Sequence, residues 1–131
     1  MSDTPKNHAR PLSPHLQVYR LPMTAIMSIS HRMTGVGLAA GCILITGFLI
    51  AAAVSEEAFE WIKWFSITLP GTLILFWWSF ALYYHLCNGI RHLIWDTVHL
   101  LDQSKALAAG WVVLLSSAAL TAATWYFASI Y

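Results

Sequence analysis

Charged residues are scarce in this sequence. Asp, Glu, Lys and Arg make up 10% of its 131 residues, whereas apolar residues make up 58%. Soluble globular domains carry about 25% charged residues. The composition therefore excludes an ordinary soluble domain and indicates a membrane protein.

Cysteine is scarce as well, with only Cys42 and Cys87 in the chain. Both fall inside long apolar runs, at no spacing that suits a metal ion. The sequence Cys-x-x-Cys-His, which attaches haem covalently, is absent. We expect both cysteines to act as small core hydrophobes.

Three runs lack charge entirely, and they cover residues 33–54, 64–90 and 106–131. Each has at least the roughly 20 residues that a helix needs to cross about 30 Å of hydrocarbon. We predict an all-α membrane protein, residues 1–131 forming one integral-membrane domain. Its expected parts are a cytoplasmic segment at 1–21 and transmembrane helices near 24–54, 64–95 and 105–131.

The basic residues divide unequally between the two sides of such a protein. Six of the seven precede the first span or flank the second loop: Lys6, Arg10, Arg20, Arg32, Arg91 and Lys105. Lys63 alone lies in the first loop, whose stretch 55–60 is acidic. The positive-inside rule predicts a cytoplasmic N-terminus and an external C-terminus. Topology accounts for these cations, so nothing suggests a nucleic-acid partner.

The first ten residues bear on the choice of membrane. They are polar, without the apolar core of a secretory signal or the Arg- and Ser-rich run of a mitochondrial presequence. We expect a bacterial inner (cytoplasmic) membrane. The mitochondrial inner membrane is the alternative, because a processed chain could have lost its presequence.

Polar residues interrupt the end of the second apolar run. On a helix they would form one stripe, made of His85, Asn88, His92, Asp96 and His99. This stripe predicts a helix face built for polar or metal chemistry. Gly89 beside it would let a flat ligand approach the backbone.

His85 lies deepest on this stripe, about 9 Å inside the span from Arg91 at 1.5 Å per residue. An ionisable group at that depth usually marks a functional position. Three readings remain open: a neutral histidine bonded to another helix, a proton relay, or an axial haem ligand. A haem would then have its propionates near His92, and no other histidine lies at the depth of His85. We therefore expect a second axial ligand from another polypeptide.

Ser28, His31 and Arg32 share one face at the predicted cytoplasmic boundary. One reading is an interfacial anchor, with Arg32 extending to the surface and Ser28 bonding a carbonyl. The reading that we favour is a polar pocket that receives a molecule from the bilayer. The third run, 106–131, is rich in small residues, which suits a scaffold helix.

Three blocks of the sequence resemble a known family, the cytochrome b membrane-anchor subunit of succinate dehydrogenase (respiratory complex II). The blocks are Arg10-Pro11-Leu12-Ser13-Pro14-His15-Leu16 with Tyr19, then Ser28-Ile29-Ser30-His31-Arg32-Met33-Thr34-Gly35, then His85 to Asp96. They follow the family's order and lie between the expected spans. For the third run the resemblance rests on topology alone.

The resemblance implies electron transfer to ubiquinone. A flavoprotein subunit would oxidise succinate, and an iron–sulfur subunit would pass the electrons to quinone at the membrane. This chain would anchor both in the lipid bilayer together with a second small anchor subunit, with which it would share a non-covalent haem b. By matching positions, His85 would be the axial haem ligand, and Ser28 and Arg32 would bind quinone. His31, His92 and Arg32 would lie near the haem propionates.

Other functions compete with this one. A haem-less structural anchor would only dock the soluble subunits, and a quinol:fumarate reductase anchor would serve the reverse reaction. A small transporter or proton channel could use His85, His92 and Asp96 as a relay. That reading would expect an intramembrane carboxylate and internal repeats, which the three uncharged runs lack.

Overall fold

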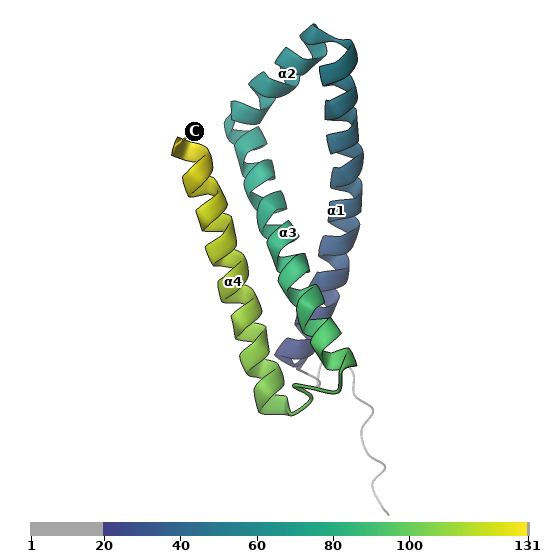
Figure 1. The fold of residues 1–131 in the computed structure, drawn as a ribbon, viewed down its shortest axis with the longest axis vertical. Coiled ribbons are helices and arrows are strands. Elements are labelled where there is room, and N and C mark those ends of the chain that lie inside the picture. The colour runs from purple at the N-terminus through teal and green to yellow at the C-terminus, as the bar shows by residue number, and fades with distance from the viewer. Residues whose placement is uncertain (1–19, 131) are drawn as a thin grey trace, which may run out of the picture.

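The computed structural model describes residues 20–130, and within them it contains four helices and no strand (Figure 1). They are α1 (Met23–Val54), α2 (Glu56–Ile67), α3 (Leu69–Asp96) and α4 (Gln103–Ile130). α1, α3 and α4 are long and apolar enough to cross a membrane. The predicted all-α protein with three spans is confirmed. The block at 10–16 with Tyr19, and most of the expected cytoplasmic segment, lie outside the described residues.

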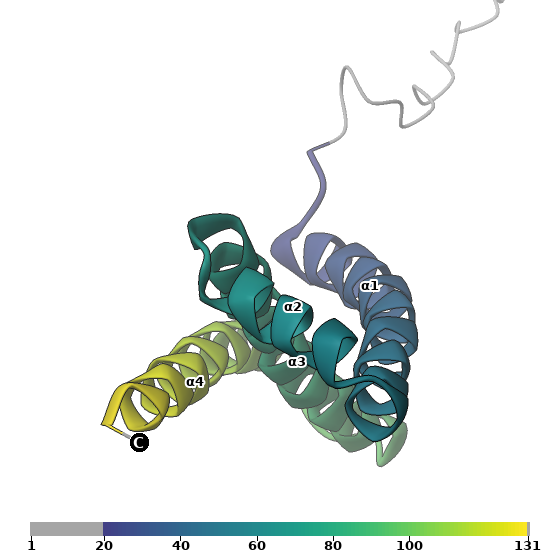
Figure 2. The same cartoon turned by 90° about the horizontal axis from the view of Figure 1, so that it is seen from above.

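The short helix α2 was not predicted, because residues 55–60 were expected to form a loop and the second span to begin near residue 64. Ser55 caps α2 by accepting a hydrogen bond from the Ala58 amide at 3.2 Å. Glu56 and Glu57 in the first turn stabilise α2, because their negative charges interact favourably with the positive end of the helix dipole. Thr68 then caps α3, with Pro70 in its first turn. The second span therefore begins at Leu69, and α2 lies across one end of the molecule (Figure 2).

α3 is the central span, with α1 on one side and α4 on the other (Figures 1 and 2). The start of α1, the end of α3 and the start of α4 lie at one end of the molecule. α2 and the end of α4 lie at the opposite end. Neighbouring spans are thus antiparallel.

Small and hydroxyl-bearing residues form the face that α4 packs against the other helices. Its buried residues are Ala106, Gly110, Val113, Ser117 and Thr121. A Cβ on Gly110 would lie 2.8 Å from the Met27 sulfur of α1, so the absence of a side chain permits this approach. The small residues of the third run therefore do serve packing, as the composition suggested.

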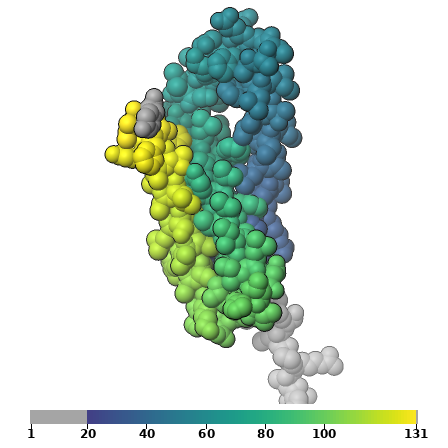
Figure 3. All heavy atoms as spheres, viewed as in Figure 1, coloured from purple at the N-terminus to yellow at the C-terminus, as the bar shows by residue number. Residues whose placement is uncertain are grey.

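The glycines of α1 and the two cysteines differ in their surroundings. Gly35 and Gly41 face side chains of α3, but a Cβ on Gly37 would meet nothing within 4 Å. Cys42 is exposed and Cys87 is partly buried, so Cys42 is not a core residue of this chain. The upper part of α1 stands apart from α3, and an opening between them is visible toward the α2 end (Figure 3).

Candidate functional site

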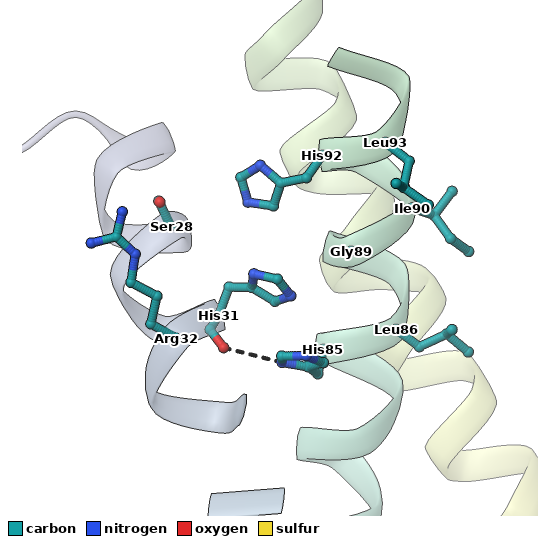
Figure 4. Close-up of a pocket in the computed structure, with 9 residues that line it drawn as sticks. All are labelled: Ser28, His31, Arg32, His85, Leu86, Gly89, Ile90, His92 and Leu93. Carbon is teal, nitrogen blue, oxygen red and sulfur yellow. Dashed lines mark hydrogen bonds between the residues drawn. The ribbon is translucent and has the colours of Figure 1, made fainter. Parts of the chain in front are cut away.

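The candidate site is a cavity between α1 and α3 at the end of the molecule where α1 begins. It has a volume of about 570 Å³. Its lining residues are Ser28, His31, Arg32, His85, Leu86, Gly89, Ile90, His92 and Leu93 (Figure 4). The residues predicted to bind quinone or haem are all in this set: Ser28, His31, Arg32, His85 and His92. Two helical faces that were recognised separately thus meet around one space.

The hydrogen bonds of His85 determine which of its ring nitrogens is free. Its Nδ1 lies 3.1 Å from the backbone oxygen of His31 and 3.2 Å from the hydroxyl of Thr34. A carbonyl oxygen can only accept a hydrogen bond, so Nδ1 carries the proton and donates it. Nε2 is then the unprotonated nitrogen, with a lone pair available for a ligand.

The His31 ring lies between the two histidines of α3 (Figure 4). Its centroid is 4.1 Å from that of His85, with an interplanar angle of 26°, and 5.1 Å from that of His92. The His31 ring is thus stacked on His85 on the side toward His92. Two rings stacked on each other in this way could not ligate one metal ion from opposite sides.

One buried nitrogen of His31 has no hydrogen-bond partner among the described residues. Its Nε2 is buried and is not bonded to any of residues 20–130. Buried polar atoms are nearly always paired in native proteins. Because His31 lines the cavity, this atom is a candidate contact for a polar group held there.

Ser28 and Ser30 differ in what their hydroxyls do, although both lie on α1. The Ser30 hydroxyl is 2.6 Å from the Tyr84 hydroxyl and also donates to backbone oxygens of its own helix. The Ser28 hydroxyl makes no hydrogen bond within the described part of the chain, so it does not bond a carbonyl as the anchor reading required. Arg32 is exposed and forms no ion pair with a described residue. Both side chains are available to a bound molecule.

The predicted polar stripe of the second span divides into two parts. Asn88 is fully buried and faces away from the cavity, where its Nδ2 donates to the Met27 oxygen at 3.1 Å. Its Oδ1 accepts from Arg91 at 3.0 Å. His99 lies beyond the end of α3 at Asp96, in the connection to α4, and is therefore not on the stripe. Only His85, Gly89 and His92 of this helix face combine in the cavity wall with the α1 residues.

Arg91 was read from the sequence only as a topological charge, yet it is 2% exposed. Its guanidinium carbon lies 4.0 Å from the centre of the Trp95 ring, which is a cation–π arrangement. It also donates to Asn88 and, at 3.5 Å, to the Ala106 oxygen of α4. Arg91 and Asn88 thus join α1, α3 and α4 next to the cavity. The sequence signal that could have predicted this hydrogen-bonded pair is the three-residue spacing of Asn88 and Arg91, which places both on one face of a helix.

These features define a three-span helical membrane protein with a histidine-lined cavity at one end. A sequence model described as "Succinate dehydrogenase/Fumarate reductase transmembrane subunit" matches residues 6–124. The chain belongs to this family, which confirms the resemblance seen in the sequence blocks.

Similar proteins come from bacteria and from a mitochondrion. The succinate dehydrogenase cytochrome b556 subunit of Paracoccus denitrificans is 50% identical over 111 residues, which cover 80% of this chain and 85% of that protein. The subunit of the same name from Rickettsia felis is 36% identical, covering 88% and 90%. The mitochondrial cytochrome b560 subunit of Dictyostelium discoideum is 37% identical, covering 91% and 62%.

Proposed function

We propose that this chain is the cytochrome b membrane subunit of a succinate:ubiquinone oxidoreductase. It anchors the flavoprotein and iron–sulfur subunits together with a second small anchor subunit, binds haem b and forms part of the ubiquinone site. Succinate oxidation itself occurs on the flavoprotein. The observation that carries the proposal is the convergence of Ser28, His31, Arg32, His85 and His92 on one cavity.

The residues present fit a non-covalent haem. His85 offers Nε2 as a neutral imidazole ligand, because its other nitrogen is already bonded to α1. The unbonded His31 Nε2, together with His92 and Arg32, offers donors for the haem carboxylates. When bound, the haem supplies reversible one-electron transfer. A second protein ligand would come from the partner anchor.

Ser28 and Arg32 supply the quinone chemistry of this chain. The hydroxyl and the guanidinium donate to a quinone carbonyl, and they stabilise the negative charge that develops on its oxygen during reduction. Arginine suits this task because it remains protonated throughout. Further donors come from the neighbouring subunits, since Arg32 is the only Lys or Arg among the described residues that line this cavity.

In this proposal the quinone site lies at the cytoplasmic end of the protein. Arg20 and Arg32 near the start of α1, and Arg91 and Lys105 near the α3–α4 connection, support a cytoplasmic position for this end. Protons for quinone reduction then come from the cytoplasm. The bacterial inner membrane is the proposed location, in keeping with the relative from Paracoccus denitrificans.

The haem assignment is tested by the dithionite-reduced minus oxidised absorbance spectrum of the purified complex. We expect a low-spin b-type spectrum in the parent, and its loss or alteration in His85→Ala. His99→Ala, which removes an exposed histidine of the α3–α4 connection, serves as the matched control and leaves the spectrum unchanged. A parent complex that assembles without haem would instead favour the haem-less anchor.

A further inference from the structure

The imidazole of His85 is held by one turn of α1, formed by His31, Thr34 and Gly35, which we call the His85 seat. The His31 oxygen and the Thr34 hydroxyl both contact Nδ1, at 3.1 and 3.2 Å. The His31 ring covers one face of the imidazole. Gly35 borders the ring edge, since a Cβ built on it would lie 3.0 Å from Cε1 of His85. Contacts at one ring face, at Nδ1 and at Cε1 leave the imidazole little freedom to rotate.

Thr34 is the side chain of this seat that can be changed without touching a backbone group. Its hydroxyl donates to the His31 oxygen at 2.8 Å. Having used its only proton there, Oγ1 must accept the Nδ1 proton of His85. Thr34 therefore helps to fix both the tautomer of His85 and the orientation of its ring.

We propose that Thr34 is a positioning residue for His85, which holds the imidazole through Nδ1 and so tunes the iron that Nε2 binds. This inference rests on the proposed haem function. A ligating histidine whose second nitrogen donates a hydrogen bond is a stronger base toward the metal. A stronger electron donor favours ferric iron, and the haem midpoint potential is lowered.

The experiment compares Thr34→Val and Thr34→Ser in the assembled complex. Valine nearly matches threonine in shape but cannot accept the Nδ1 proton, whereas serine keeps the hydroxyl. The readouts are haem content per complex, the midpoint potential from a redox titration, and the low-spin electron paramagnetic resonance signals. Thr46→Val is the matched control, because the Thr46 hydroxyl bonds only to Cys42 of its own helix and faces outward.

We expect Thr34→Val to retain haem, with a higher midpoint potential and shifted resonance signals. Thr34→Ser and Thr46→Val should match the parent. A Thr34→Val complex with the parent's potential and signals would overturn the inference. Should Thr34→Val fail to assemble, Gly35→Ala provides the second test, because its Cβ displaces the His85 ring by a few tenths of an ångström. Unchanged haem properties in Gly35→Ala would also count against the seat.

Failure of the positioning role of Thr34 is distinguishable from failure of the proposed haem function. If the parent lacks haem, or if His85→Ala leaves its spectrum unaltered, the haem assignment itself is wrong. If His85→Ala alters the spectrum while Thr34→Val matches Thr46→Val, the haem assignment stands and the positioning role of Thr34 is wrong.

Discussion

At the scale of single residues, the site depends on which polar groups are left unused by the fold. Ser30, Asn88 and Arg91 are committed to packing, because each is bonded to another helix. Ser28 and Arg32 line the cavity without such bonds. The two residues that best suit quinone are therefore the ones that the fold does not require.

Changing Arg32 to Ala should reduce quinone-dependent activity by about 10²-fold, which is typical for loss of one donor to a developing oxyanion. Succinate oxidation with a soluble artificial acceptor should remain at the parent rate, because that reaction does not need the membrane site. Both rates are measured on the same purified complex. Arg20→Ala, an exposed arginine just before α1, is the matched control. Equal loss of both activities in Arg32→Ala would indicate a role in assembly and not in quinone binding.

The residues of the site could be predicted from sequence, but the contacts between their side chains could not. Helical periodicity alone places Ser28, His31 and Arg32 on one face. The contact of Thr34 with His85 depends on how α1 and α3 are rotated about their axes. Both helices are apolar on nearly all sides, so their hydrophobic pattern does not specify that rotation.

At the scale of elements, the capping residues carry information that the charge pattern does not. The uncharged run at 64–90 suggested one continuous span, but the helices break at Thr68. Ser55 before Glu56 and Glu57 is a helix-start signal, as is Thr68 before Pro70. Reading these signals would have predicted α2. The polarity of residues 55–60 alone was a poor guide, because a helix lying at a membrane surface can be equally polar.

Gly41 controls the approach of α1 to α3. A Cβ there would collide with the Trp78 indole, coming 2.8 Å from its Cζ2 atom. We expect Gly41→Ala to destabilise the helix pair by about 1–3 kcal/mol, as overpacking does. Gly47→Ala meets open space and should be neutral or stabilising by up to about 1 kcal/mol through helix propensity. Thermal unfolding of the two purified variant complexes measures the difference, and equal transition temperatures would contradict this packing role.

At the scale of the whole molecule, the order of the spans places the cavity and the α3–α4 connection at one end, opposite α2 (Figure 1). All-α architecture and three spans followed from the lengths of the uncharged runs. Charge asymmetry then predicts which end faces the cytoplasm.

Cysteine labelling in intact cells measures this orientation. In a chain with Cys42→Ala and Cys87→Ala, we expect Glu57→Cys in α2 to react with a membrane-impermeant maleimide added outside. Gln103→Cys at the start of α4 should react only after the cells are permeabilised. Both positions are exposed, so accessibility within the fold does not bias the comparison. The reverse labelling pattern would invert the topology and move the cavity to the outer side.

The two walls of the cavity are far apart in sequence, so the ribosome completes one of them seconds before the other. His31 and His85 touch across 54 positions of sequence. At a synthesis rate of roughly 5–20 residues per second, the ribosome needs about 3–11 s to add the intervening residues. During this interval Ser28, His31 and Arg32 enter the membrane on a lone helix, with no opposing face. Until the histidines of α3 have been translated, the α1 wall of the cavity has no partner within this chain.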